Sequence, residues 1–434
     1  MNIIDIITKK RDEKCLTKEE IDFFINGYTN GTITDYQAAA LIMAIYLNGL
    51  NKQETADLTM AMAYSGDILD LSEIGDNIID KHSTGGVGDK ITLILMPVIA
   101  SLGVPVAKMS GRGLGFTGGT IDKLESIPGY NTEISVDEFI KNVKTNGISL
   151  MGQTLNLASA DKKIYALRDS IGCVENIPLI ASSIMSKKIA AGANKIVLEV
   201  TVGDGAFMKT QEQAEFLANQ MIEIGKLCNK ETICILTNMD EPIGYSIGNN
   251  LEVIEAIKAL QGDINEDVKV IVETLGAYML CLAGKGDNIE ENKNMIYQNI
   301  VNGKAYEKFV ELVKSQGGDI SYIEDVTKFE KAEIKLDVVA RKQGYIKNIQ
   351  VEKLGRISGF LGAGRIKKED KISYEVGLTV NKKIGEYIKT GEKIATIYAN
   401  DLEKGKIAQK KVEDCFEIVD GFVEKPEIIL GIIK

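Results

Sequence analysis

Polar and apolar positions over residues 1–66 repeat with the spacing of short amphipathic helices. Residues 17–20, Thr-Lys-Glu-Glu, form a capping box, in which the threonine and glutamate side chains pair with free backbone N–H groups at a helix start. Further helices are expected over residues 36–47 and 52–64. The N-terminal part of the chain is therefore predicted to form a helical layer.

After residue 76 the pattern changes to short apolar runs, each followed by a glycine-rich loop and a longer amphipathic stretch. The runs lie at residues 77–80, 104–109, 195–200 and 232–237. Buried strands that alternate with helices form a largely parallel sheet. We therefore expect a large α/β domain with a central, mostly parallel sheet, built from residues 76–152 and 195–335.

Two stretches with helical propensity, at residues 161–169 and 180–192, separate the two parts of this domain. They could return to the N-terminal helices, so we assign residues 1–66 and about 160–190 to one small, discontinuous α-helical domain. Further along the chain, GYI, GRISGFLGAGR, YEVGLTV and GEKIATIYA predict short strands between glycine turns. Residues 340–434 are therefore expected to form a small C-terminal α+β domain. The fold class is α/β, in an α+β multidomain arrangement.

Length and composition agree with a globular protein of two or three domains. The chain has 434 residues, of which 44% are hydrophobic and 26% charged, and a domain usually has roughly 100–200 residues. The apolar runs are shorter than the roughly 18 residues that span a bilayer. Six cysteines without a CxxC pair or regular spacing are typical of reduced thiols. We expect a cytoplasmic protein without a membrane segment.

Charge narrows the kinds of ligand. A net charge of −11 argues against a nucleic-acid surface, because a polyanion is bound by a basic face. Residues 81–123 nevertheless hold five basic and two acidic side chains, which favours binding of a small anion. His82 is the only histidine in the sequence, so multi-histidine metal sites are excluded and one imidazole remains for acid–base chemistry.

The first candidate site is KHSTGGVGDK at residues 81–90, which lies between a predicted strand and an apolar helix over residues 91–102. Backbone N–H groups and helix starts bind anions in this arrangement. Lys81, Ser83 and Thr92 could supply charge and hydroxyl donors. The spacing matches neither a P-loop nor a dinucleotide fingerprint. By itself the segment is equally consistent with a glycine turn in an α/β connection.

A second glycine-rich segment, KMSGRGLGFTGGTIDKLE at residues 108–125, also follows a predicted strand and opens a helix. It has five glycines within residues 111–119, and Ser110 and Thr120 stand at its ends as hydroxyl donors. So flexible a backbone needs an ordering agent, such as a bound anion. Because loops after successive parallel strands converge at one edge of a sheet, the two segments together predict an anion site.

A third set consists of Arg168, Ser183 and Lys187. Ser183 and Lys187 are four residues apart, so they share one face of a helix. Spacing alone does not show whether Lys187 binds a ligand or is simply solvated beside Lys188. The pattern leaves both interpretations open.

These segments together resemble the thymidine and pyrimidine-nucleoside phosphorylase family. SGRGLGFTGGTIDKLE at residues 110–125 is the most specific motif, and KHSTGGVGD, YALRD, IASSIMSKK and GAGR (362–365) extend the resemblance over nearly the whole chain. It implies a homodimer, in which a discontinuous helical domain joins a larger α/β domain. It also implies reversible phosphorolysis without an organic cofactor. Inorganic phosphate would attack a pyrimidine nucleoside such as uridine, thymidine or deoxyuridine, giving the free base and α-configured ribose or deoxyribose 1-phosphate.

The resemblance implies roles for the residues singled out above. Positions that match the family's phosphate site are Lys81, Ser83, Thr92, Lys108, Met109, Ser110 and Thr120. Positions that match its pyrimidine site are Leu114, Arg168, Ser183 and Lys187. The last three would be catalytic together with His82, because the departing base gains negative charge that such donors stabilise. His82 would hydrogen-bond or protonate a carbonyl oxygen of the base.

Two features depart from the family pattern. Phe116 stands where many members have histidine, and we expect altered base preference rather than loss of activity. A potassium site of the family matches positions Gly88, Lys90, Ile243, Ser246 and Glu255. Lys90 replaces a hydroxyl residue there, and its ammonium could fill the place of the cation and pair with the glutamate. We therefore expect little dependence on monovalent cations, with bound potassium as the alternative.

Three other interpretations stay open. A thymidine phosphorylase specific for deoxyribose would exclude the 2′-hydroxyl, whereas Lys108 before SGRG resembles the broader pyrimidine enzymes. A phosphoribosyltransferase of related fold would need paired carboxylates for magnesium, which both glycine-rich segments lack. A regulatory nucleotide sensor would bind without turnover and would leave the third set of residues without a purpose.

Overall fold

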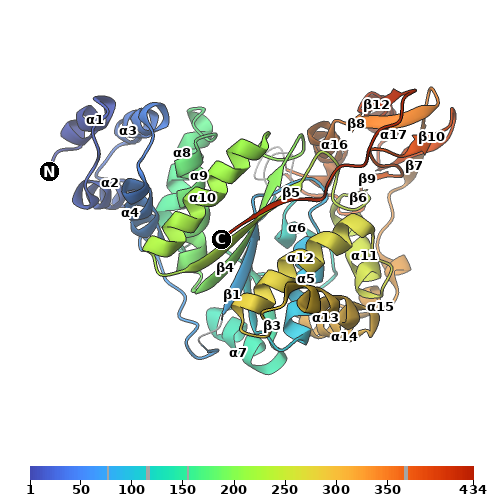
Figure 1. Ribbon diagram of the computed structural model, residues 1–434, viewed down its shortest axis with the longest axis horizontal. Coiled ribbons are helices and arrows are strands. Elements are labelled where there is room, and N and C mark those ends of the chain that lie inside the picture. Colours follow the sequence, from blue (N-terminus) through green and yellow to red (C-terminus); the bar gives the residue numbers. More distant parts are fainter. Residues whose placement is uncertain (76–77, 114–117, 154–155, 366–369) are drawn as a thin grey trace.

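The computed structural model describes residues 1–75, 78–113, 118–153, 156–365 and 370–434 of the chain. The N-terminal helices lie at one end of the molecule, a central sheet flanked by helices lies in the middle, and a smaller region of strands lies at the opposite end (Figure 1). This arrangement agrees with the expected α/β fold and its additional smaller domains.

Four helices form the N-terminal layer: α1 (Ile3–Arg11), α2 (Lys18–Asn30), α3 (Asp35–Asn48) and α4 (Lys52–Ala63). The predicted capping box is present at α2, because Thr17 Oγ1 accepts a hydrogen bond from Glu20 N at 3.3 Å and Glu20 Oε2 accepts one from Thr17 N at 2.7 Å. The apolar faces meet in a cluster that includes Ala160 and Ile164 of α8 (Ser159–Ser170). A segment distant in sequence therefore completes this layer.

The central sheet has the strand order β1-β4-β5-β13. Its members are β1 (Ile79–Ser83), β4 (Lys195–Val202), β5 (Glu231–Asn238) and β13 (Ile429–Ile433). The first three are parallel, while β13 runs antiparallel to β5. A second parallel pair consists of β2 (Val106–Ser110) and β3 (Ile148–Gly152). The predicted strands and their mostly parallel arrangement are confirmed, and the end of the chain returns to the central sheet although the sequence pattern assigns it to the C-terminal domain.

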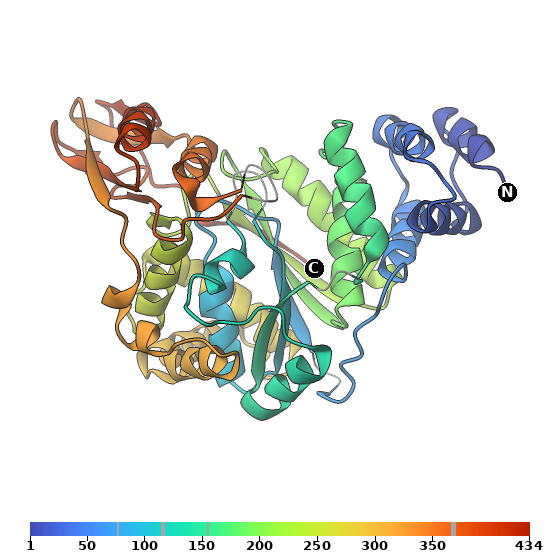
Figure 2. The same ribbon diagram turned by 180° about the vertical axis from the view of Figure 1, so that it is seen from behind.

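Two long helices lie between the N-terminal layer and the sheet, α9 (Ile177–Ala190) and α10 (Gln211–Leu227) (Figure 2). Ala181 and Met185 of α9 pack in one buried cluster with Leu198 of β4 and Leu217 of α10. Helix α9 therefore rests on the sheet, and the side chains that it carries are held at a fixed position above β1 and β4.

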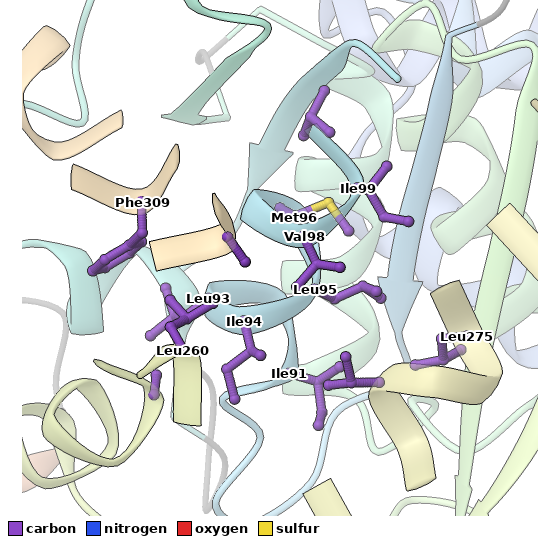
Figure 3. Packing of buried hydrophobic residues seen from close by; sticks show 14 of the residues in the cluster. Ile91, Leu93, Ile94, Leu95, Met96, Val98, Ile99, Leu260, Leu275 and Phe309 are labelled. Atoms are coloured by element: carbon purple, nitrogen blue, oxygen red, sulfur yellow. The ribbon is translucent and has the colours of Figure 1, made fainter. Parts of the chain in front are cut away.

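Helix α5 (Ile91–Ser101) is apolar on every side, as predicted, and its residues 91–100 are all buried. Its side chains meet Leu260, Leu275 and Phe309 in the core (Figure 3). Helices that surround this core are α7 (Val136–Asn146), α11 (Asn249–Leu260), α12 (Glu266–Leu282), α13 (Ile289–Val301), α14 (Lys304–Ser315) and α15 (Ser321–Glu324). A helix without a polar face is stable only when buried, so α5 fixes the glycine-rich segment that precedes it.

The C-terminal domain contains two small sheets, with strand orders β10-β8-β12 and β6-β9-β11-β7. Their strands are β6 (Ser246–Ile247), β7 (Ile334–Val339), β8 (Gly344–Ile349), β9 (Gly377–Val380), β10 (Tyr387–Ile388), β11 (Lys393–Ala399) and β12 (Phe416–Val419). Helix α17 (Leu402–Glu413) covers them. The strands predicted at GYI, YEVGLTV and GEKIATIYA are confirmed as β8, β9 and β11.

The strand predicted for GRISGFLGAGR was wrong. Helix α16 (Val351–Ser358) occupies its first part and continues into a wide helical turn at Gly359–Ala363. Val351, Leu354 and Ile357 recur with helical spacing and lie in the core of the C-terminal domain. This periodicity determines the local structure, and the glycines do not mark turns between strands.

Candidate functional site

A cavity of about 300 Å³ lies where the carboxyl ends of β1 and β2 face α8 and α9. Its walls include eleven of the residues predicted to bind phosphate or pyrimidine: Lys81, His82, Ser83, Thr92, Lys108, Met109, Ser110, Thr120, Arg168, Ser183 and Lys187. An adjoining cavity of about 640 Å³ shares Ser110, Tyr165 and Lys187 with it. Three segments that are far apart in the sequence therefore meet around one cleft. Leu114 and Phe116 lie outside the described residues.

The first glycine-rich segment is held by pairing between β1 and β4. Lys81 of β1 is fully buried, and its Nζ lies 2.7 Å from Oε2 of Glu199 on β4. Burial disfavours the ammonium ion, but Asp89 and Glu199 outweigh this effect and raise the pKa of Lys81. Gly85 N donates to Ser83 Oγ at 3.1 Å, which folds the backbone over the end of the strand. The segment thus presents a charged lysine at the floor of the cavity.

The second glycine-rich segment is closed on itself at its two ends. Gly113 N donates to Oδ2 of Asp122, which lies in α6 (Thr120–Leu124), at 2.7 Å. A Cβ atom added to Gly119 would lie 2.1 Å from Gly113 N, so the two backbones pass each other at a distance that excludes any side chain. This close approach brings Ser110 and the start of α6 to the same wall of the cavity.

Lys108 belongs to a buried cluster of three charges. Its Nζ lies 3.0 Å from Oδ1 of Asp80 and donates to Lys81 O at 2.7 Å, while Lys188 Nζ lies 2.7 Å from Oδ2 of Asp80. Burial lowers the pKa of Lys108 to about 7, although Asp80 acts in the opposite direction. Below that pH two ammonium groups share one carboxylate, so the cluster then has an excess of positive charge next to the cavity, where an anion would be stabilised.

Helices α8 and α9 supply the other wall. Lys187 Nζ lies 2.7 Å from Oδ2 of Asp161 and 2.8 Å from Oγ of Ser183. Arg168 is 1% exposed, and it donates to the carbonyl oxygens of Cys173 at 3.0 Å, Val174 at 2.5 Å and Leu179 at 3.2 Å. These bonds use three of its five N–H donors. Arg168 thereby fixes the turn into α9 as well as lining the cavity.

His82 lies between the two walls, at the end of β1. Burial and the positive charges of Lys188 and Lys108 lower the pKa of His82 well below its usual range. The imidazole is therefore neutral near neutral pH before an anion binds, and one ring nitrogen can donate a hydrogen bond while the other accepts one.

The five positions matched to a potassium site contain an ammonium group at their centre. Lys90 is fully buried, and its Nζ donates to Ile243 O at 2.5 Å, Ser246 O at 3.2 Å and Glu255 Oε2 at 2.9 Å. A Cβ atom added to Gly88 would meet Ile243 O at 2.7 Å. Lys90 therefore donates hydrogen bonds to the same oxygen atoms that would coordinate a cation. The residues present do not fit a bound potassium ion.

Sequence reasoning missed the acidic partners of the site lysines, namely Asp80, Asp161 and Glu199. It also left Lys188 as a candidate for a solvated surface residue, whereas this residue is 1% exposed and paired with Asp80. Asp80 lies directly before Lys81, and this acidic residue at the end of an apolar run was the available signal. The pairing of Asp80 with Lys188, which lies 108 residues away, leaves no pattern in the local sequence.

Comparisons with known proteins cover the whole chain. Residues 75–306, more than half of it, match the family described as glycosyl transferase family, a/b domain. Residues 4–66 match its helical bundle domain, and residues 345–419 match the pyrimidine nucleoside phosphorylase C-terminal domain. The three matches agree with the helical, α/β and C-terminal regions of the structure.

Relatives of known name are similar over almost their full length. The pyrimidine-nucleoside phosphorylase of Geobacillus stearothermophilus is 51% identical over 95% of this chain and 96% of its own. The pyrimidine-nucleoside phosphorylase of Bacillus subtilis is 52% identical over 92% of each chain, and that of Staphylococcus aureus N315 is 50% identical over 100% of each.

A solved structure of lower identity shares the fold. Anthranilate phosphoribosyltransferase from Thermus thermophilus superimposes with a TM-score of 0.60 and 18% identity, covering 72% of this chain and 99% of the other. Among the described residues, no helix has the length and apolar character needed to cross a membrane.

Proposed function

The chain belongs to the pyrimidine-nucleoside phosphorylase family of glycosyl transferases, and we propose that it cleaves uridine, thymidine and deoxyuridine with inorganic phosphate. The products are the free base and α-configured ribose or deoxyribose 1-phosphate, and the reaction is reversible. The observation that carries the proposal is the cavity in which both glycine-rich segments face Ser183 and Lys187 of α9. A cationic site for an anion and a polar site for a base therefore line the same cavity.

The phosphate site consists of cationic and hydroxyl donors at the carboxyl ends of β1 and β2. Lys81 and Lys108 supply charge, Ser83, Thr92, Ser110 and Thr120 supply hydroxyl groups, and Met109 lines the wall. Phosphate bound at this site is an anionic nucleophile. Because it is held in a fixed position, much of the entropy cost of bringing two substrates together is removed before the reaction. The excess positive charge of the Asp80 cluster supports binding of this anion.

The base site is on α8 and α9. Cleavage of the glycosidic bond leaves positive charge on the sugar and negative charge on the pyrimidine. Lys187 and Arg168 stabilise the charge on the pyrimidine oxygens, and Ser183 contacts the ring N–H. Leu114, outside the described residues, is assigned to the same substrate site. Because these donors gain strength as the base departs, they stabilise the transition state more than the ground state.

His82 serves as a hydrogen-bond donor to a carbonyl oxygen of the base. Its lowered pKa makes the neutral imidazole the resting form. Bound phosphate brings negative charge near the same lysines and opposes that shift, so protonation of His82 becomes more favourable once phosphate is bound, and a protonated His82 can then act as the acid toward the base.

Two finer assignments complete the proposal for the site. The ammonium of Lys90 takes the place of a monovalent cation, which makes the enzyme independent of potassium. The main alternative for substrate is a thymidine phosphorylase that accepts deoxyribose alone. The relatives that are 51% and 52% identical are named pyrimidine-nucleoside phosphorylases, which favours the broader specificity.

The proposed assembly is a homodimer formed through α3. Tyr36, Ala40, Met43 and Leu47 are exposed and recur at intervals of four, three and four residues on this helix. Such a stripe of apolar side chains on a helix is typical of a packing surface.

We place the enzyme in the cytoplasm, in agreement with its six free thiols. We also assign residues 1–66 and about 160–190 to one discontinuous helical domain.

The test is release of free base, measured by ultraviolet absorbance, from uridine, thymidine, deoxyuridine and inosine in parallel with and without phosphate. Phosphate-dependent cleavage of the three pyrimidine nucleosides but not inosine supports the proposal. Cleavage confined to the deoxynucleosides would favour the thymidine enzyme. No phosphate-dependent cleavage of any of them would contradict the proposed function.

A further inference from the structure

The C-terminal domain contacts the second glycine-rich segment through a partly buried ion pair. Arg365 Nη1 lies 2.7 Å from Oδ1 of Asp122, and the two side chains are 23% and 4% exposed. Arg365 ends the GAGR motif and is 243 residues away from Asp122 in the sequence. Neither residue is among those assigned above to phosphate or base.

Asp122 connects this arginine to the backbone of the phosphate segment. Its Oδ2 accepts a hydrogen bond from Gly113 N at 2.7 Å, and its Oδ1 accepts one from Arg112 Nη1 at 3.2 Å. Gly113 is the residue whose backbone passes closest to Gly119 at the other end of the segment. The carboxylate of Asp122 therefore joins the two ends of the segment that lies between Ser110 and Thr120.

A carboxylate that is 4% exposed has lost most of its contact with water and is stabilised by a nearby positive charge. Arg112 is shared, because its Nη2 also donates to Glu125 Oε1 at 2.7 Å and its side chain is 41% exposed. Arg365 is less exposed and makes the shorter contact with Asp122. It is therefore the stronger of the two partners that orient the carboxylate.

The chain just before Arg365 is held by hydrogen bonds from α11 and from Ser373 of the C-terminal domain. Ala363 O accepts a hydrogen bond from Asn249 Nδ2 at 2.9 Å, and Gly362 O accepts one from Ser373 N at 3.0 Å. Gly362 has a φ of 115°, a backbone conformation that favours glycine. The C-terminal domain thus presents the guanidinium at a defined position next to the cavity.

We propose that Arg365 is a positioning residue, which acts through Asp122 to hold Gly113 and the start of α6, at the two described ends of the second glycine-rich segment, in the arrangement that binds phosphate. This inference rests on the proposed function for the identity of the anion. It gives the C-terminal domain a part in substrate binding, although none of the residues assigned to the site belongs to that domain.

The experiment measures phosphate affinity directly, by titration calorimetry with inorganic phosphate on the full-length protein. Arg365→Gln should raise the dissociation constant for phosphate about tenfold. This is the effect expected for loss of a charge-assisted contact that orders a binding segment. Arg365→Lys keeps the charge and should stay within about threefold of the wild type. Arg341→Gln is the matched control, because it removes an exposed arginine of the same domain that pairs with Glu413.

Asp122→Asn tests whether Arg365 acts through Asp122. It should weaken phosphate binding at least as much as Arg365→Gln, and adding Arg365→Gln to it should change the dissociation constant by less than about twofold, because both act on one contact. In steady-state assays the KM for phosphate should rise with little change in the KM for nucleoside. A purely structural contact would instead lower the melting temperature and leave the phosphate affinity of the folded enzyme unchanged.

An Arg365→Gln protein that binds phosphate within about twofold of the wild type would overturn the inference, as would a full additional loss in the Asp122→Asn background. The proposed function is tested separately. Wild-type protein that binds phosphate without cleaving any nucleoside would contradict that function, and the calorimetric comparison would still decide the role of Arg365. Wild-type protein that binds no phosphate would overturn both.

Discussion

The ammonium of Lys187 lies 2.7 Å from the carboxylate of Asp161, so an ion pair joins α9 to α8 at the base side of the cavity. The aspartate side chain is 8% exposed and the lysine side chain 23%. Asp161 thereby determines where the positive charge of Lys187 is placed, and a residue that does not line the 300 Å³ cavity controls one that does.

Replacement of Asp161 by asparagine should reduce kcat/KM for nucleoside by about tenfold or more, because Lys187 loses the partner that orients it. The phosphate affinity should change little, since the phosphate residues lie on the opposite wall. Steady-state kinetics with each substrate varied in turn makes the measurement. Asp169→Asn, an exposed position on the same helix, is the control. Equal losses for both substrates would show that Asp161 has a general structural role instead.

The affinity for a divalent anion should fall as pH rises through about 7. Burial lowers the pKa of Lys108 to about 7, so this lysine is charged below that pH and increasingly neutral above it. Sulfate is the suitable probe, because its own charge does not change between about pH 6 and pH 9, whereas that of phosphate does. Sulfate should bind about tenfold more weakly at the upper end of that range.

Lys108→Met provides the control for this pH dependence, because it removes the titrating group. The variant should bind sulfate weakly at every pH, with a flatter profile than the wild type. A wild-type profile as flat as that of the variant would show that Lys108 stays charged over the whole range.

Lys90→Ser should create a dependence on monovalent cations. The substitution removes the ammonium that pairs with Glu255 and leaves the carbonyl oxygens of Ile243 and Ser246 without their donor. Loss of one partner from a buried pair costs about 3–5 kcal/mol, so thermal stability should fall. Potassium chloride should restore part of it, while tetramethylammonium chloride at equal ionic strength should not.

The wild-type protein supplies the comparison for this prediction. Its melting temperature and activity should be the same in the two salts. A selective loss on replacing potassium would contradict the assignment of Lys90 to the cation's place.

Gly119→Ala should damage phosphate binding far more than its size suggests. Its Cβ would lie 2.1 Å from Gly113 N and 2.4 Å from the carbonyl carbon of Arg112, and neither backbone atom can move without opening the segment. Overpacking of this kind costs about 1–3 kcal/mol or more. Gly111→Ala is the matched control for stability, because a Cβ there meets no atom within 4 Å. Equal melting temperatures and phosphate affinities in the two variants would contradict the close approach.

Local sequence patterns predict much of this architecture. The capping box at residues 17–20 and the largely apolar run at 91–102 predict helices correctly, because each signal is complete within a few neighbouring residues. Glycine-rich segments after predicted strands likewise pointed to the edge of the sheet where the cavity lies. The strand prediction at residues 355–365 is wrong because the helical repeat of buried side chains, and not the glycines, determines the local structure there.

Local sequence patterns do not predict which charged residues pair with one another. Asp80 holds Lys188 across 108 residues, and Arg365 holds Asp122 across 243. An acidic residue with such a partner has the same local sequence as one in solvent, because the pairing depends on how distant strands and helices are brought together. The sequence therefore indicated which basic and hydroxyl residues form the site, and the fold was needed to show what fixes them.

The homodimer can be tested at the apolar stripe on α3. Tyr36 and Leu47 are 74% and 71% exposed in the single chain, a cost that contact with a second copy would remove. Replacement of both by aspartate should place like charges opposite each other in a symmetric interface and shift the protein to a monomer, as measured by light scattering after size-exclusion chromatography. Val301→Asp, at a 55% exposed position on α13, should leave the mass unchanged. A wild-type monomer, or a double variant that stays dimeric, would show that α3 is not the interface.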